Sequence, residues 1–292
     1  MTETAVRASA RCWLPGLATS IDHLGRLAIR SLYREVALPL KPGLVCPGSR
    51  GSHADMDFAS FVRSLQALRA YFPAITACGC DNPRLPALQA LGIAAERRML
   101  AATGGVNTHR GAIFNLGLLG AASGYLLAGE QVLDAASACR CVAERWGKEI
   151  LADLAQAPAD SHGLLVARRY GSGGARQEAA AGFPAALAIG LPAYRGILAA
   201  TGDPELAAAQ ALFALIAEVE DSNLLWRGGL DGLAFGRRQA ADFLAAGGVL
   251  ASDWRERAQA IDAAFVARRL SPGGSADLLG VTLFLAELDG LA

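Results

Sequence analysis

The sequence is poor in aromatic and charged residues, which make up 7% and 18% of its 292 residues. Aromatic and β-branched residues are the usual strand formers, so a chain dominated by alanine and leucine favours helices. Lysine plus arginine and aspartate plus glutamate each number 27, which makes the formal net charge zero. This balance provides no electrostatic footprint for a nucleic acid or an anionic membrane surface. Any cationic binding site must therefore be local.

Cysteine is also scarce, and the six cysteines are Cys12, Cys46, Cys78, Cys80, Cys139 and Cys141. The first thirty residues lack the continuous apolar core and small-residue cleavage site of a secretory signal. Both observations predict a reduced, cytoplasmic protein. The two C-x-C pairs lack the longer spacer that is common in zinc sites, and a C-x-C pair on a helix points about 200° apart. We therefore assign no metal to the cysteines.

One uncharged run, residues 111–129 (GAIFNLGLLGAASGYLLAG), has the length of a membrane-spanning helix. Its five glycines, together with Asn115, Ser123 and Tyr125, argue against a helix that faces lipid. Glycine and alanine allow neighbouring helices to approach closely. We interpret the run as the central buried helix of a helical bundle and expect no membrane partner.

Glycine and proline divide the rest of the chain into helical stretches separated by loops. A helix is expected over 16–38, followed by a Pro- and Gly-rich loop over 39–54. Helical spacing of apolar residues predicts further helices over 55–71, 83–102, 109–128, 130–155, 176–201, 204–222, 236–246, 253–268 and 275–289. Convincing strands, linkers and repeats are absent from the sequence. We predict one all-α, bundle-like domain over residues 1–292.

Polar residues gather in glycine-bearing loops that lead into predicted helices. These loops span 41–57, 103–111, 161–179, 221–229 and 271–279. Glycine lets a ligand approach the backbone, and a helix N-terminus offers unpaired amides and partial positive charge to an anion. Helix capping would explain Asn107 and Ser275, but not the recurrence of Arg110, Arg176 and Arg227, whose guanidinium groups suit phosphate. Because the loops lack both the phosphate-loop and the Rossmann glycine patterns, they predict a phosphate site in a helical architecture.

Four segments resemble the signature segments of the triphosphoribosyl-dephospho-CoA synthase family: "GSHADMD" after "KPGLV", "GGVNTHRGAIF", "YGSGGARQEAAAGFP" and "PGGSADLL". They occur in the family's order and span residues 35–280 or so. Arg110 stands where family members commonly have lysine, and Cys46 and Pro47 stand where an aspartate is expected after "PGLV". Arginine preserves the positive charge at that position.

The resemblance implies that ATP and 3'-dephospho-CoA are the substrates. The triphosphoribosyl group of ATP would be transferred to the 2'-hydroxyl of the acceptor, with release of adenine. The product is a prosthetic-group precursor for the acyl carrier protein of malonate decarboxylase or citrate lyase. It would pass to a phosphoribosyl-dephospho-CoA transferase that acts on this carrier protein.

This chemistry requires a carboxylate near an oxocarbenium-like carbon, a proton acceptor for the attacking hydroxyl, and Mg²⁺ with cationic donors for the triphosphate. We predict Mg²⁺ ligands among Asp55, Asp57, Glu96 and Asp221, and Asp55 is also a candidate catalytic carboxylate. Glu178 and His109 are alternative general bases. Residues predicted to bind the substrates are Lys41, Ser52, His53, Gly104, Gly105, Asn107, Thr108, Arg110, Arg176, Asn223, Arg227, Gly273, Gly274 and Ser275.

Two other classes of function are open from the residues alone. The same carboxylates and phosphate donors would serve an Mg²⁺-dependent phosphohydrolase or nucleosidase if water replaced the acceptor. The chain lacks the adjacent His-Asp pair that would favour a helical phosphohydrolase. A non-catalytic helical scaffold would need no more polar loop residues than capping requires, and these loops contain more. The sequence leaves a homodimer open.

Overall fold

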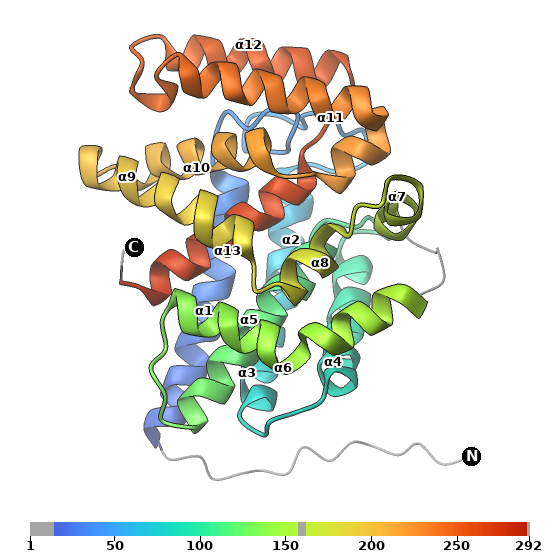
Figure 1. Ribbon diagram of the computed structural model, residues 1–292, viewed down its shortest axis with the longest axis vertical. Coiled ribbons are helices and arrows are strands. Elements are labelled where there is room, and N and C mark those ends of the chain that lie inside the picture. The colour runs from blue at the N-terminus through green and yellow to red at the C-terminus, as the bar shows by residue number, and fades with distance from the viewer. Residues whose placement is uncertain (1–14, 157–161, 291–292) are drawn as a thin grey trace.

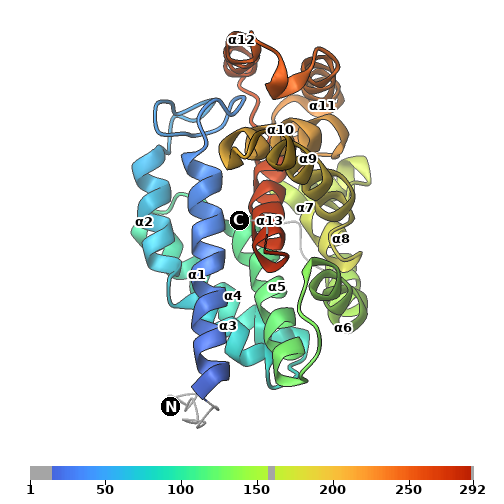
Figure 2. The same cartoon turned by 90° about the vertical axis from the view of Figure 1, so that its left-hand side faces the viewer.

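The computed structural model describes residues 15–156 and 162–290, which fold into a set of packed helices (Figures 1 and 2). Within these residues the structure contains no β-strand, and Cys46 and Ser49 form an isolated β-bridge. The predicted all-α class is confirmed. Cys12 lies outside the described residues, and the other five cysteines are free thiols.

The helices before residue 157 are α1 (Pro15–Ala37), α2 (Phe58–Leu68), α3 (Tyr71–Gly79), α4 (Leu85–Ala102), α5 (Arg110–Ala128) and α6 (Ala135–Gln156). Those after residue 161 are α7 (His162–Tyr170), α8 (Gly174–Ala180), the π-helix η1 (Ala186–Gly190), α9 (Leu191–Thr201), α10 (Pro204–Glu218), α11 (Ser222–Ala245), the 3₁₀-helix η2 (Gly248–Leu250), α12 (Trp254–Ala267) and α13 (Gly273–Leu288). The α11 and α12 helices form a pair at one end of the molecule (Figure 1).

Helix α5 is the apolar run singled out in the sequence, and it lies in the core. It is long and apolar enough to cross a membrane, yet 72% of its apolar window is buried inside the protein. Helix α3 crosses it closely: a Cβ added to Gly79 would lie 2.0 Å from the carbonyl oxygen of Ala121. A Cβ added to Gly124 would lie 2.0 Å from the carbonyl oxygen of Thr76. The interpretation of this run as a buried core helix is therefore confirmed.

The last helix, α13, packs against the first helix, α1. It also packs against α5 and α10, and Figure 2 shows α1 (blue) and α13 (red) side by side. Buried apolar side chains of the first and last helices, such as Leu32 and Leu279, therefore share one core.

Some helix boundaries differ from the prediction. The helix expected over 55–71 is α2, and α3 follows it as a separate helix that begins at Tyr71 with Pro73 in its first turn. The helix expected over 176–201 is interrupted, because Phe183 adopts φ +57° between α8 and η1. Helix α11 begins at Ser222, in a segment expected to be a loop, and bends at Gly229, where φ is +61°.

Candidate active site

A cavity of about 1320 Å³ lies where several helices begin. The N-termini of α5, α8, α11 and α13 line it, and the C-terminal end of α1 and the loop after it close another side. A helix N-terminus has partial positive charge and amides without a partner inside the helix. The loops that the sequence predicts to bind phosphate thus surround one cavity.

Most of the predicted site residues line this cavity: Lys41, His53, Glu96, Asn107, Thr108, His109, Arg110, Arg176, Glu178, Asp221, Asn223, Arg227, Gly273 and Gly274. The predicted residues outside its lining are Ser52, Asp55, Asp57, Gly104, Gly105 and Ser275.

The residues outside the lining have local structural roles. Gly104 and Gly105 adopt φ +68° and +88° where the chain turns after α4. Asp57 is the N-cap of α2, since its Oδ1 accepts a hydrogen bond from the Ser60 amide at 2.9 Å. Hydrogen bonds from Ser60 lower the pKa of Asp57 to about 2. Asp55 is largely exposed, with its Oδ1 3.8 Å from His53 Nδ1.

Asp221 has its carboxylate oxygens occupied by protein donors. Oδ1 accepts from the amides of Asn223 (2.8 Å) and Leu224 (3.2 Å) at the start of α11. Oδ2 accepts from the Ser275 amide (2.7 Å) and hydroxyl (2.9 Å) at the start of α13. Asp221 therefore holds two helix N-termini together beside the cavity, and Ser275 is its partner in this contact.

Arginines occupy the exposed rim of the cavity. Arg110 Nε donates to Glu96 Oε1 at 2.6 Å, and Arg176 Nη1 lies 2.7 Å from Asp153 Oδ2. These ion pairs hold the guanidinium groups in place while leaving donors free. Glu96 is thus used by Arg110, and the described residues contain no group of three or more His, Cys, Asp or Glu side chains that could hold a metal ion.

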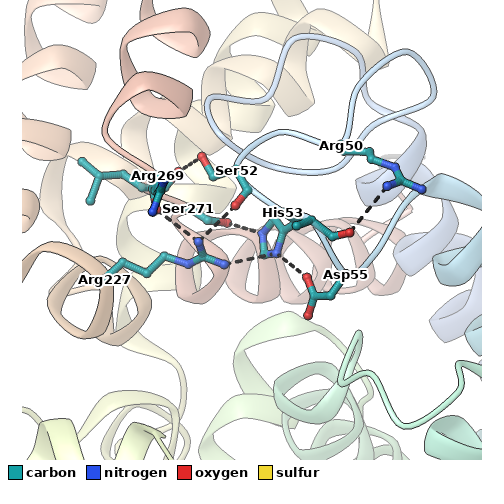
Figure 3. Close-up of polar contacts among 9 residues, drawn as sticks. Arg50, Ser52, His53, Asp55, Arg227, Arg269 and Ser271 are labelled. Carbon is teal, nitrogen blue, oxygen red and sulfur yellow. Dashed lines mark hydrogen bonds and ion pairs between the residues drawn. The ribbon is translucent and has the colours of Figure 1, made fainter.

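The third rim arginine, Arg227, is held by neutral acceptors (Figure 3). It donates to the carbonyls of Ser52 (3.2 Å) and Arg269 (3.1 Å) and to His53 Nδ1 (3.2 Å). Arginine has no acceptor, so His53 Nδ1 must accept and Nε2 must carry the proton. His53 Nε2 then donates to Ser271 Oγ at 2.9 Å. Burial and the charge of Arg227 lower the pKa of His53 to about 4, which keeps the ring neutral.

His109 lies deeper, at the N-cap of α5. Its Nδ1 is 2.6 Å from Ser64 Oγ, and Phe61 meets the ring edge-on at 4.9 Å between centroids. Its Nε2 is buried without a hydrogen-bond partner. Burial, together with the charge of Lys41, lowers the pKa of His109 to about 3. A neutral imidazole therefore lines the cavity with one nitrogen free.

The other predicted base, Glu178, also lines the cavity. Its Oε1 accepts a hydrogen bond from the Ala185 amide at 2.7 Å, across the break between α8 and η1. Burial raises the pKa of Glu178, while the hydrogen bonds from the Ala185 and Ala186 amides oppose this shift. One carboxylate oxygen of Glu178 is thus occupied by a backbone amide, whereas His109 Nε2 has no hydrogen-bond partner in the described residues.

Acidic residues at the buried end of the cavity have no assigned role in the sequence-based prediction. Glu35, at the end of α1, forms a buried ion pair with Lys41, whose Nζ lies 2.6 Å from Glu35 Oε1. Asp277, in α13, makes no hydrogen bond or ion pair within the described part of the chain. Burial, with Glu35 and Asp221 nearby, raises the pKa of Asp277 well above its usual value. Asp277 lies in the motif "PGGSADLL", so its position in the sequence could have indicated a role in the site. Glu35 lies in no such motif.

Comparisons with known proteins identify the family of this chain. The chain matches the family described as CitG: ATP:dephospho-CoA triphosphoribosyl transferase over residues 21–292. The probable 2-(5''-triphosphoribosyl)-3'-dephosphocoenzyme-A synthase of Acinetobacter calcoaceticus is 46% identical over 272 residues, which cover 93% of this chain and 92% of the relative. The 2-(5''-triphosphoribosyl)-3'-dephosphocoenzyme-A synthase of Escherichia fergusonii is 41% identical over 286 residues, 94% of each chain.

The synthase of the same name from Klebsiella pneumoniae is 42% identical over 265 residues, 88% of each chain. No solved structure matches this chain. The similarity extends over almost the whole length of each relative, so it covers every segment that surrounds the cavity. The chain belongs to the CitG family of ATP:dephospho-CoA triphosphoribosyl transferases.

Proposed function

We propose that the cavity is the active site in which this enzyme transfers the 5-triphosphoribosyl group of ATP to the 2'-hydroxyl of 3'-dephospho-CoA. The product is 2'-(5''-triphosphoribosyl)-3'-dephospho-CoA, and adenine is released. The observation that carries this proposal is the convergence of Arg110, Arg176 and Arg227 with several helix N-termini on one cavity. A volume of about 1320 Å³ exceeds the ~300–1,000 Å³ of a pocket for one ligand. Two large substrates need that room.

The charges in the cavity are divided by depth, which orients ATP. The arginines lie at the exposed rim, whereas Glu35 and Asp221 are buried and Asp277, beside them, is partly buried. The triphosphate binds at the rim, where guanidinium groups and helix amides are available, because buried carboxylates would repel it. Lys41 is paired with Glu35 and only 2% exposed, so we assign it to the structure of the buried end rather than to the triphosphate.

The reaction moves one proton from the acceptor hydroxyl to the purine. The N-glycosidic bond of ATP breaks, a bond forms between the ribose C1 and the acceptor 2'-oxygen, and adenine leaves carrying a proton. Asp277 is a buried carboxyl group with a raised pKa and no protein partner among the described residues, so it holds a proton that it can donate to adenine. Glu178 and His109 remain the two candidates for accepting the hydroxyl proton.

Mg²⁺ enters with ATP as part of the substrate. The carboxylates predicted to bind it are not gathered: Asp57 and Asp221 cap helices, and Glu96 pairs with Arg110. Mg²⁺ in nucleotide enzymes is usually held by substrate phosphates, several waters and one or two carboxylates. The triphosphate at the rim therefore supplies most of its ligands.

The cellular setting is also a proposal. The free thiols of the described cysteines and the burial of α5 support a cytoplasmic enzyme. Its product would pass to a phosphoribosyl-dephospho-CoA transferase acting on the acyl carrier protein of malonate decarboxylase or citrate lyase. A homodimer remains a prediction that light scattering of the purified protein tests.

The test of the activity is adenine release. The purified protein is incubated with ATP, Mg²⁺ and 3'-dephospho-CoA, and free adenine is measured by chromatography. Adenine should appear only when the acceptor is present. Release without the acceptor would show a nucleosidase, and no release in the complete mixture would contradict the proposal. CoA, whose 3'-phosphate adjoins the 2'-hydroxyl, should be a much poorer acceptor.

A further inference from the structure

The wall of the cavity formed by the start of α5 carries polar atoms without partners. Four buried side-chain nitrogen or oxygen atoms lack a hydrogen bond in the described residues, and three of them are Thr108 Oγ1, His109 Nε2 and Asn115 Oδ1. All three residues line the cavity. Such orphan atoms are rare in folded proteins because each has lost its water without compensation. Their grouping on one wall points to a ligand that supplies the missing partners.

Asn115 is the most informative of these residues. Asn115 is 1% exposed, and within the described residues its side-chain Oδ1 has no hydrogen-bond partner. Other buried polar side chains of the core helices are satisfied: Ser123 Oγ donates to the Leu119 carbonyl and Thr282 Oγ1 to the Leu278 carbonyl, each at 2.8 Å. Asn115 is therefore an exception in a helix that otherwise buries no unpaired amide.

The position of Asn115 places its ligand beside Asp277. Gly111 precedes Asn115 by one turn, about 6 Å along the same face of α5. A Cβ added to Gly111 would lie 1.9 Å from Asp277 Oδ2, so the Asp277 carboxyl group rests against this turn. A ring bound by Asn115 thus has the Asp277 carboxyl group as a neighbour.

We propose that Asn115 binds the adenine ring of ATP and selects it over other purines; this inference rests on the proposed function. An asparagine amide pairs one donor and one acceptor with the N7 and 6-amino groups of adenine. A 6-oxo purine presents two acceptors on that edge, and one of them faces the amide oxygen. The leaving base is then held next to Asp277, the residue that donates its proton.

The experiment compares ATP with ITP as the triphosphoribosyl donor. For wild type, Asn115→Leu and Asn115→Asp, kcat/KM of base release is measured with each nucleotide. Wild type should prefer ATP. Both variants should lose about 5- to 150-fold in kcat/KM for ATP and most of this preference. The thermal midpoint of Asn115→Leu should not fall, because an unpaired buried amide has been removed. Ser123→Ala, on the same helix outside the cavity, should keep the preference.

A second arm separates the two adenine rings of the substrates. It measures kcat/KM for 3'-dephospho-CoA and for its inosine analogue at saturating ATP. An effect of Asn115→Leu confined to this arm would overturn the assignment to ATP. Equal losses for ATP and ITP together with a lower thermal midpoint would overturn the inference in favour of a packing role. Absence of adenine release by wild type would contradict the proposed function instead, so the two failures are distinguishable.

Discussion

The partners of each rim arginine determine how much of its charge a ligand can use. Arg110 is about half exposed and shares its guanidinium group with Glu96, which fixes its direction. A phosphate contacting it would form charge-assisted hydrogen bonds. This ion pair makes Arg110 a preorganised donor at the N-terminus of α5.

Replacing Arg110 should therefore weaken the enzyme without unfolding it. We expect Arg110→Ala to raise KM for ATP or lower kcat, with a loss in kcat/KM of about 10- to 100-fold from missing charge-assisted hydrogen bonds. Arg257→Ala, which removes an exposed ion pair with Asp253 on α12, is the control. Steady-state kinetics equal to wild type would show that Arg110 does not contact the triphosphate.

Asp277 is expected to act as an acid. Asp277→Asn should lower kcat by about 10²- to 10⁴-fold. In wild type, kcat should fall as the pH rises through the raised pKa of Asp277, because the group must be protonated to donate. The variant should lack this decline. Its free energy of unfolding at pH 7 should be no lower than that of wild type, since a buried carboxyl with a raised pKa destabilises the fold above its unfolded pKa.

Asp262→Asn is the matched control, because burial also raises the pKa of Asp262 but this residue lies outside the cavity lining. If it lowers kcat as much as Asp277→Asn does, the assignment of the acid is wrong.

We expect His109 to make the unfolding free energy depend on pH. Its folded pKa is about 3, below the 6.5 of an unfolded histidine, so the unfolded state binds the proton first as the pH falls. Between pH 7 and pH 5 the wild type should lose about 2 kcal/mol of unfolding free energy relative to His109→Gln. Urea denaturation of both proteins at the two pH values measures this difference. If the unfolding free energies of the wild type and His109→Gln changed equally between the two pH values, the His109 ring would be solvated.

The positions of the charged groups could be predicted from sequence, but their partners could not. Arg110 and Arg176 follow glycine-rich stretches and Arg227 precedes the pair Gly228–Gly229, and this shared pattern predicted that they line one phosphate site. Asp57 and Asp221 look identical to metal ligands in sequence, because capping and metal binding use the same side chain at the same place in a helix. For Asp57 the donor is Ser60, three residues further along the chain, whereas for Asp221 the distinction depends on Ser275, which becomes its neighbour only in the fold.

At the scale of elements, the crossing of α3 and α5 depends on glycine. Gly124→Ala would place a Cβ 2.0 Å from the Thr76 carbonyl oxygen, so the helices must separate. We expect a loss of about 1–3 kcal/mol in unfolding free energy, as for overpacked cores. Gly196→Ala, in an open position on α9 with nothing within 4 Å, should instead gain up to about 1 kcal/mol. Chemical denaturation measures the unfolding free energy of both variants. Similar changes in Gly124→Ala and Gly196→Ala would contradict the close packing of α3 against α5.

Helix boundaries were predictable where glycine and proline act as ordinary breakers. The prediction missed α3 because Pro73 resembles a stop, although proline is tolerated in a first helical turn. It shortened α11 because the pair at Gly228 and Gly229 resembles a loop, whereas the helix continues after a bend. In both elements, packing against the core outweighs local preference.

For the whole molecule, the dispersed carboxylates predict how it responds to chelators. EDTA should abolish adenine release if, as we propose, Mg²⁺ enters with ATP as part of the substrate. The thermal midpoint of the free protein should change by less than ~2 °C, because structural metal binding would add folding energy and the described residues show no such metal group. Differential scanning calorimetry with and without EDTA checks this. A large drop would reveal a bound structural ion.

The pairing of α1 with α13 has a consequence for biosynthesis. At about 5–20 residues per second, a ribosome needs roughly 15–60 s to make this chain. Throughout that time α1 can pack against α2, α3 and α5 but not against α13, and Asp277 is absent from the cavity. The nascent chain therefore leaves uncovered the face of α1 that packs on α13, which chaperones can bind, and it becomes able to consume ATP only once its last helix has left the exit tunnel.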